Sequence, residues 1–358
     1  MMKQKKVIIA LSGGVDSAVA AALLKRANFE VRGVFLKLAD LPGLREAEAR
    51  ARKVAKILKI PFYVFNFEKE FKKRIVDYFL KENKKGLTPN PCVVCNKEIK
   101  FGLLLEKALT VDADYLATGH YARKKQLTTD NLQLTTYKLL RARDKNKDQS
   151  YFLWMLNQEQ LKRILFPIGD YTREEVENLA RKFKLPVLKA RKSVEICFIK
   201  TTINDFLKKY LGERPDKLIC LTPGVKHVKE GKVIGEYRGL WFYTIGQRKG
   251  IGLPGGPYWV LDKDLKKNRL IVTKNERDLH KKELFAKNIN WISDRKPKLP
   301  LKVKVKIRYR HQPASATIYK LSTTHYKLTF DRPQRAITPG QSVVFYKGEE
   351  LLGGGIIC

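Results

Sequence analysis

Residues 7–17, Val-Ile-Ile-Ala-Leu-Ser-Gly-Gly-Val-Asp-Ser, decide the fold of this chain. An apolar, β-branched run stops at a Ser-Gly-Gly turn, and an Asp-Ser pair opens a helix of small residues. This order forms an anion cradle, because two glycines free the backbone, successive amides converge, and the helix N-terminus adds partial positive charge. No lysine follows the glycines, so the loop differs from the one that ends in Gly-Lys-Ser/Thr. The predicted ligand is a phosphate or pyrophosphate; the plain alternative is a strand–helix turn capped by Asp16 or Ser17.

The rest of the first half alternates strands and helices. Short apolar runs at 7–11, 31–37, 62–67 and 113–117 predict buried strands, and apolar residues at helical spacing separate them. This pattern predicts an α/β fold with a doubly wound parallel sheet, whose ligands bind beyond the carboxyl ends of the strands. Near residue 212 Gly, Pro and β-branched residues become dominant. We therefore expect an α/β domain over 1–210, a small β-rich domain over 211–278 and a β-barrel over 279–358.

Charge points to a polyanionic partner. The net charge is +37, from 73 basic and 36 acidic side chains, which favours nucleic acid over an anionic membrane surface. The stretch 301–310 alternates apolar and cationic residues, which predicts one strand with a buried apolar face and five exposed cations suited to a phosphate backbone. No apolar run approaches the roughly 20 residues of a membrane span, and no apolar signal core precedes the first strand. We expect a cytoplasmic protein.

The cysteines are candidates for chemistry. Their number, five, argues against a disulfide framework. Cys92 and Cys95 form a C-x-x-C pair and Cys197 stands alone, which leaves four interpretations open: half of a zinc site, a redox dithiol, a reactive thiol, or cluster ligation together with Cys197. We expect Asn96 to cap a helix, which places Cys95 at a helix start near lysines and favours its thiolate.

Nine stretches, in order along essentially the whole chain, resemble the bacterial and organellar tRNA-specific 2-thiouridylases, members of the PP-loop ATP pyrophosphatases. They are Ser12–Ser17, Thr88–Pro91, Cys95–Phe101, Thr118–Tyr121, Asn146–Phe152, Ile196–Ile199, Thr244–Gly250, Arg308–Arg310 and Thr338–Gln341. The resemblance implies that 1–210 is an adenine nucleotide alpha hydrolase-like catalytic domain and that the barrel over 279–358 binds tRNA.

The resemblance also implies an activity: ATP-dependent 2-thiolation of the wobble uridine of the tRNAs for lysine, glutamate and glutamine. AMP transfer onto the 2-oxygen would create the leaving group. Cys197 would carry a persulfide, and Cys95 would act as nucleophile by ordinary thiol–disulfide exchange. ATP and Mg²⁺ are the implied cofactors. The implied partners are tRNA and a sulfur-donor protein or free sulfide, with no membrane and no DNA.

The implied site residues fall into two sets. Those for ATP are Ala10, Leu11, Ser12, Gly13, Gly14, Val15, Asp16, Ser17, Leu36 and Gly119. Those for tRNA are Asn90, Pro91, Cys92, His120, Lys147, Asp148, Gln149, Arg308, Tyr309 and Gln341, of which 90–92 face the target base.

Two departures from the family pattern matter. Cys92 stands where many members have aspartate, so Cys92, Cys95 and Cys197 can hold three irons of a [4Fe–4S] cluster and leave the fourth iron open for sulfide. Cluster-dependent thiolation is therefore the alternative mechanism. Residues 192–195, Lys-Ser-Val-Glu, replace a common Asp-Ser-Thr-Gly. Remote alternatives are a PP-loop ligase acting on a small metabolite and a catalytically inactive RNA-binding protein.

Overall fold

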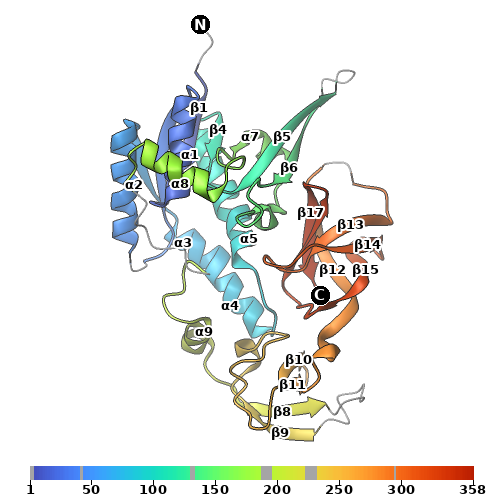
Figure 1. Ribbon diagram of the computed structural model, residues 1–358. Coiled ribbons are helices and arrows are strands. Elements are labelled where there is room, and N and C mark those ends of the chain that lie inside the picture. Colours follow the sequence, from blue (N-terminus) through green and yellow to red (C-terminus); the bar gives the residue numbers. More distant parts are fainter. Residues whose placement is uncertain (1–3, 41–42, 130–133, 187–195, 222–231, 294–295) are drawn as a thin grey trace.

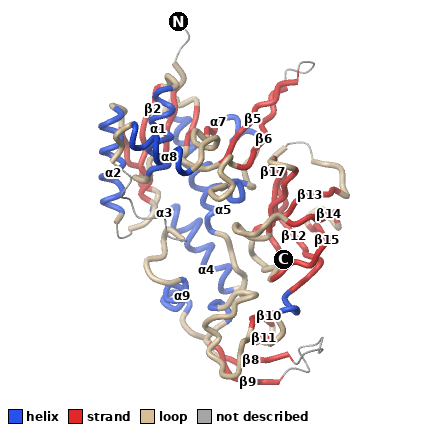
Figure 2. The backbone as a smooth tube through the Cα atoms, viewed as in Figure 1, coloured by secondary structure: helices blue, strands red, loops and turns tan. Residues whose placement is uncertain are grey.

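The computed structural model describes residues 4–40, 43–129, 134–186, 196–221, 232–293 and 296–358 (Figure 1). Residues 192–195 lie outside these ranges. Within them, helices concentrate in the first part of the chain and strands in the last (Figure 2). The strands of these described ranges form three sheets.

The first sheet is parallel, with the order β3-β2-β1-β4-β7. Its strands are β1 Lys6–Ala10, β2 Glu30–Lys37, β3 Phe62–Asn66, β4 Tyr115–Ala117 and β7 Ile164–Leu165. The chain runs outward from β1 through β2 to β3 and then returns to the other side of β1 as β4. The switch point of this doubly wound sheet therefore lies between β1 and β4, where such sheets bind ligands. The predicted fold class is confirmed.

Helices cover both faces of this sheet. Val7 and Ile9 of β1 pack with α1, α2 and α8, whereas Ile8 packs with α6 on the other face. The helices are α1 Val15–Arg26, α2 Leu44–Leu58, α3 Glu68–Phe71, α4 Asp77–Lys84, α5 Pro91–Cys95, α6 Leu104–Thr110, α7 Gln158–Arg163, α8 Arg173–Lys182 and α9 Ile203–Leu211. Two π-helical turns, Lys72–Val76 and Asn96–Leu103, join α3 to α4 and α5 to α6. None of the helices in the described ranges is long and apolar enough to cross a bilayer.

The later strands build two further sheets. The order β10-β11-β8-β9 joins β8 Asp216–Leu221, β9 Lys232–Tyr237, β10 Trp259–Asp264 and β11 Arg269–Thr273. A barrel follows, in which β12 pairs with both β15 and β17 and so closes the ring. Its strands are β12 His280–Trp291, β13 Leu301–Lys306, β14 Ala314–Lys320, β15 His325–Arg335, β16 Ser342–Lys347 and β17 Glu350–Ile357.

The α/β part and the barrel share one sheet. The hairpin of β5 Ala122–Thr129 and β6 Leu134–Arg141 extends from the α/β part, and β6 pairs with β17 of the barrel. Beside this seam, the buried Trp154 donates from Nε1 to Ser342 Oγ at 3.0 Å, and the Tyr151 hydroxyl donates to the Ser342 carbonyl at 2.9 Å. A Cβ added at Gly354 would lie 2.8 Å from the Trp154 ring, so the packing leaves no spare room.

One strand is shorter than predicted. β13 ends at Lys306, and residues 307–310 form a turn. Lys306 is buried, and its ammonium lies 5.6 Å from the centroid of the Tyr309 ring and 5.9 Å from that of Tyr151. The prediction of a ten-residue strand with five exposed cations is therefore wrong, because two aromatic rings from different parts of the chain enclose the third cation.

Candidate active site

The loop after β1 has the geometry of an anion cradle. Gly13 has a φ of +74°, and a Cβ there would lie 2.3 Å from the Ala47 carbonyl oxygen. Arg50 Nε donates to the Gly13 carbonyl at 3.1 Å, which ties the loop to α2. Gly14 has a φ of −97°, which other residues adopt. The expectation of special backbone conformations is right for Gly13 and wrong for Gly14.

Serine hydroxyls hold the loop against the start of α1. Ser17 Oγ accepts from the Ser12 amide and donates to the Gly14 carbonyl, both at 3.1 Å. Gly14 is the N-cap residue, and no side chain caps the helix, so the alternative of a turn capped by Asp16 or Ser17 is wrong. The amides at this helix start are left to bind a ligand.

Gly119 brings the end of β4 against this loop. A Cβ at Gly119 would lie 2.6 Å from the Ser17 amide nitrogen, so only glycine permits the approach. The loop after β1 and the segment after β4 thus meet at the switch point of the sheet.

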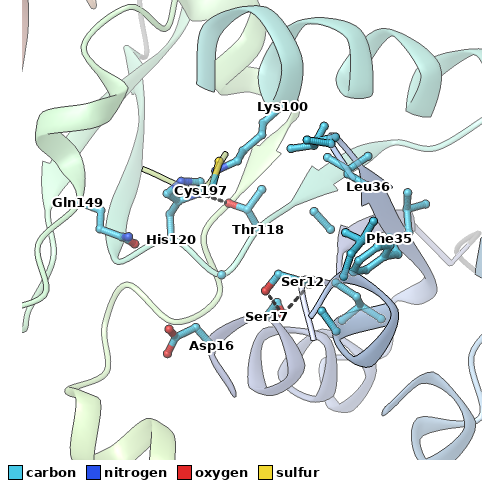
Figure 3. A pocket seen from close by; sticks show the side chains of 18 residues that line it. Ser12, Asp16, Ser17, Phe35, Leu36, Lys100, Thr118, His120, Gln149 and Cys197 are labelled. Atoms are coloured by element: carbon cyan, nitrogen blue, oxygen red, sulfur yellow. Dashed lines mark hydrogen bonds between the residues drawn. The ribbon is translucent and has the colours of Figure 1, made fainter. Parts of the chain in front are cut away.

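A pocket of about 400 Å³ opens at this place (Figure 3). Ser12, Asp16 and Ser17 lie on one side, and Lys100, His120 and Cys197 lie on another. Of the residues predicted for ATP, those that line the pocket are Ala10, Leu11, Ser12, Asp16, Ser17, Leu36 and Gly119. Gly13, Gly14 and Val15 belong to the loop but not to the lining. Most of the predicted nucleotide residues and Cys197, one of the two cysteines predicted to react, therefore share a cavity.

The position of Cys95 in its helix differs from the predicted position. The helix starts at Pro91 with Asn90 as its N-cap, so Cys95 lies a full turn inside it, and the predicted cap Asn96 is wrong. Cys95 is buried beside Ile99, and burial raises the pKa of its thiol to about 12 although Lys100 opposes this. The predicted thiolate is therefore wrong for the protein without bound RNA, because desolvation outweighs one nearby cation.

Cys197 is exposed and lines the pocket. Its neighbour Phe198 is buried among Phe71, Phe79 and Phe206, with ring centroids 5.5–5.8 Å apart, and this anchors the segment. Desolvation by the surrounding residues raises the pKa of Cys197, and Cys92 raises it further.

The three cysteines lie within electrostatic reach of one another, since Cys92 and Cys197 each affect the pKa of Cys95. Within the ranges that the structure describes, however, no three Cys, His, Asp or Glu side chains gather as a metal site requires. The arrangement of thiols does not fit a cluster as it stands. Asp16, by contrast, offers a carboxylate in the pocket, which is the ligand type that Mg²⁺ prefers.

His120 is buried between Phe101 and Phe166. Its Nδ1 shares a hydrogen bond of 2.8 Å with Thr118 Oγ1. Burial, and then the charge of Lys100, hold the pKa of His120 well below its ordinary value, so the ring is neutral at physiological pH.

The turn around Asp148 holds another part of the predicted tRNA set. Asp148 is buried and accepts from Arg141 Nε at 2.9 Å and from two backbone amides, so it fixes the turn that exposes Lys147. Gln149 lines the pocket, and its Oε1 accepts from the Tyr121 amide at 2.9 Å.

The loop over 86–91 contacts both β-rich parts. Gln341 Nε2 donates to the Thr88 carbonyl at 2.8 Å, and the Thr88 amide donates to the Pro339 carbonyl at 3.0 Å. From the second sheet, Lys263 Nζ donates to the Gly86 carbonyl at 2.8 Å. We call this contact region the joint. It leads directly into three residues predicted to contact tRNA, Asn90, Pro91 and Cys92. Of these, Pro91 is buried and Cys92 is half-buried.

Arg308 and Tyr309 lie in the turn after β13. Arg308 is exposed, and its Nη1 donates to the Arg335 carbonyl at 3.2 Å. The Tyr309 ring packs on Phe152 with centroids 4.5 Å apart, so this barrel turn rests on the α/β part.

Sequence reasoning missed two residues beside the loop. Arg173 Nη1 lies 2.7 Å from Asp16 Oδ1, and the Tyr121 hydroxyl donates to the same oxygen at 2.9 Å. A signal was present, because arginine occupies the first position of α8, where the helix dipole disfavours a cation. The sequence indicated lysines near Cys95 but not that one of them, Lys100, lines the pocket.

Comparison with known proteins gives a consistent result. Three family models match in succession: the tRNA methyl transferase HUP domain over 5–201, its PRC-barrel domain over 204–274, and the aminomethyltransferase beta-barrel domain over 281–357. The tRNA-specific 2-thiouridylase MnmA of Moorella thermoacetica is 45% identical, covering 98% of both chains. MnmA of Clostridioides difficile is 42% identical over all of this chain and 99% of its own, and MnmA 2 of Geobacillus kaustophilus is 42% identical over 99% and 95%.

Solved structures are more distant. The U34-tRNA thiolase NcsA from Methanococcus maripaludis with its [4Fe-4S] cluster has a TM-score of 0.36 and 20% identity, covering 58% of this chain and 67% of its own. An NMN synthetase from Francisella tularensis has a TM-score of 0.32 and 15% identity, covering 54% and 67%. At these scores neither bears on the activity of this chain.

Proposed function

This chain belongs to the tRNA-specific 2-thiouridylase family, and from that premise we propose that it is an ATP-dependent tRNA-uridine 2-sulfurtransferase. Its substrate is the wobble uridine of the tRNAs for lysine, glutamate and glutamine, and it acts in the cytoplasm. The observation that carries the proposal is that Cys197 opens into the same pocket as the anion-binding loop. The family models carry methyltransferase names, but a thiol in a nucleotide pocket favours sulfur transfer.

The first step is activation of the base. The loop over 10–17, with Leu36 and Gly119, holds ATP, and Asp16 supplies a carboxylate for Mg²⁺, which neutralises phosphate charge when bound. The 2-oxygen of uridine attacks the α-phosphorus, the bond to the β-phosphate oxygen breaks, and pyrophosphate leaves. The 2-oxygen becomes part of a good leaving group, AMP.

The second step delivers sulfur. A sulfur-donor protein that carries a persulfide passes its outer sulfur to Cys197 and leaves as a thiol, which the exposure of the Cys197 side chain permits. Free sulfide, the other expected donor, would serve the cluster route described below. The Cys95 thiolate attacks Cys197 Sγ, the bond to the terminal sulfur breaks, and hydrosulfide is released toward C2 of the adenylated base. AMP departs with the oxygen. The Cys95–Cys197 disulfide left by the exchange is reduced by an external dithiol, which is itself oxidised to a disulfide, before the next cycle. Since Cys95 is buried and protonated, RNA binding must first change its surroundings.

Two of the residues that we assign to tRNA, His120 and Gln149, line this pocket. Those we assign to tRNA are Asn90, Pro91, Cys92, His120, Lys147, Asp148, Gln149, Arg308, Tyr309 and Gln341. Asp148 acts through the turn that it fixes, since its carboxylate is buried. The barrel over 279–358 supplies Arg308, Tyr309 and Gln341.

Thiolation through a [4Fe–4S] cluster on Cys92, Cys95 and Cys197 is the second candidate. The mutual electrostatic influence of the three thiols favours it, whereas their spread does not fit a cluster without rearrangement. Anaerobic incubation with iron and sulfide, followed by absorbance and Mössbauer spectra, distinguishes the two. Thiolation should survive Cys92→Asp if the persulfide route operates and should be lost if a cluster is needed.

Thiolation of anticodon stem-loops, measured by mass spectrometry of 2-thiouridine, tests the main proposal. We expect ATP-dependent sulfur incorporation that Cys197→Ser abolishes and that Cys358→Ser, a change at an exposed cysteine outside the pocket, leaves intact. RNA binding without any product would instead support an inactive RNA-binding protein. ATP turnover with a small metabolite, and none with RNA, would support a ligase.

A further inference from the structure

The ion pair between Arg173 and Asp16 connects α8 to the anion-binding loop. Asp16 lies at the end of the anion-binding loop and lines the pocket. Its Oδ1 receives both the Arg173 guanidinium, at 2.7 Å, and the Tyr121 hydroxyl, at 2.9 Å. One oxygen of the carboxylate that would hold Mg²⁺ is therefore already engaged in the protein without ATP.

The position of Arg173 has an electrostatic cost that its local ion pair with Glu177 only partly offsets. It is the first residue of α8, where the helix dipole favours acidic side chains, and Glu174 and Glu175 follow it. A residue that breaks a local rule in this way is expected at a functional site. The chain places this cation beside the loop rather than where the helix alone would favour it.

The contacts of Arg173 leave it able to change partners. Its Nε donates to Glu177 at 2.7 Å, while Nη1 reaches Asp16. Both the Arg173 and Asp16 side chains are about one-third exposed, so neither is locked in a core. If Asp16 turns to a metal ion, Glu177 still orients the guanidinium through Nε, and Nη1 of Arg173 becomes available for a second anion. Arginine suits phosphate oxygens because its donors form a planar fork.

We infer that Arg173 binds the pyrophosphate end of ATP and that Asp16 holds it in reserve until Mg²⁺ takes the carboxylate. This inference rests on the proposed function, in which pyrophosphate is the leaving group. Arg173 then stabilises the charge that develops on the departing pyrophosphate. No bond is made or broken by the exchange; two ion pairs replace one.

Binding of inorganic pyrophosphate and of AMP, measured by calorimetry with EDTA present, tests the inference. Asp16→Asn releases Arg173, so this variant should bind pyrophosphate at least fivefold more tightly than the natural protein. The gain should vanish in the Asp16→Asn/Arg173→Ala double variant. With Mg²⁺ in place of EDTA, Arg173→Ala alone should weaken pyrophosphate binding about tenfold or more, the effect of losing a charge-assisted hydrogen bond, with AMP binding changed less than twofold.

Two controls keep the test decisive. Arg143→Ala removes the same charge and also breaks an ion pair to α8, at Glu175, without touching Asp16, so it should leave both affinities unchanged. Arg173→Lys should restore part of the pyrophosphate affinity. The inference is overturned if the double variant keeps the gain of Asp16→Asn, if AMP binding falls as far as pyrophosphate binding, or if the natural protein binds no pyrophosphate. Failure of thiolation with these affinities as predicted would count against the proposed function alone.

Discussion

Cys95 lies among apolar side chains, and this burial raises the pKa of its thiol to about 12, whereas Cys197 is exposed at the pocket. Only the thiolate reacts with alkylating agents. In the protein without RNA at pH 7.5, we expect iodoacetamide to modify Cys197 at least tenfold faster than Cys95. Peptide mass spectrometry over a time course measures both rates, with the exposed Cys358 as reference. Equal rates at the two positions would contradict the buried position of Cys95.

His120 gives a stability prediction with a definite sign. Its pKa is lowered by burial and then by Lys100, so the unfolded chain takes up the proton first as pH falls. The free energy of unfolding is at its full value above the pKa of histidine in the unfolded chain, near 6.5. Below that pH it decreases by up to about 1.4 kcal/mol per pH unit. Denaturant unfolding at pH 7.0 and 5.5 measures the free energy of unfolding at both values. Its decrease between them should be smaller in His120→Gln than in the natural protein. His325→Gln, a change at an exposed histidine, should leave the loss unaltered.

At the scale of the element, the loop between β1 and α1 was predictable from the sequence. The start of the helix that carries Cys95 was predicted at the wrong residue. A Ser-Gly-Gly turn between a strand and a helix is compatible with few local structures other than an anion-binding loop. The helix start was misplaced because Asn90 and Asn96 are both good caps, and the proline at the first helical position was the signal that selects Asn90. The burial of Lys306 at the end of β13 was not predictable from the alternation, since one of the two rings that enclose it, Tyr151, comes from a distant segment.

The two loop glycines give an element-scale test. Gly13→Ala places a Cβ 2.3 Å from the Ala47 carbonyl oxygen at a φ of +74°, and should lower the free energy of unfolding by about 1–3 kcal/mol. Gly14→Ala, at a φ of −97°, should be neutral or stabilise by up to about 1 kcal/mol. Denaturant melts of both variants provide the measurement. Equal losses would mean that Gly14 also needs its freedom.

At the scale of the whole molecule, the joint connects the barrel and the second sheet to the segment that carries Cys95. Gly340→Ala should separate the barrel from this segment, because its Cβ would lie 2.8 Å from the Thr88 amide nitrogen. We expect at least a tenfold loss of tRNA thiolation, with ATP binding within twofold of normal. Gly348→Ala is the matched control, since it also has positive φ but meets no atom within 4 Å. Similar losses in both variants would assign the effect to backbone strain instead.

The contacts between the parts of the molecule could not be predicted from the sequence. Changes in composition predict three parts, but nothing local shows that Gln341 reaches Thr88 or that Lys263 reaches Gly86, over separations of 253 and 177 residues. The family resemblance supplied Gln341 as an RNA contact without indicating its contact with the loop. Such contacts come from how the parts pack, which no periodicity encodes.

The pairing of β6 with β17 has a consequence for how this protein can be divided. Leu139 and Leu140 lie opposite Leu351 and Glu350, so the last strand of the chain covers an edge of the hairpin that follows β4. Removal of the barrel would expose that edge to pairing with other chains. The barrel is therefore not an exchangeable cassette. A fragment that ends before β12 should tend to aggregate, and grafting of another RNA-binding module onto the α/β part would have to supply a matching strand.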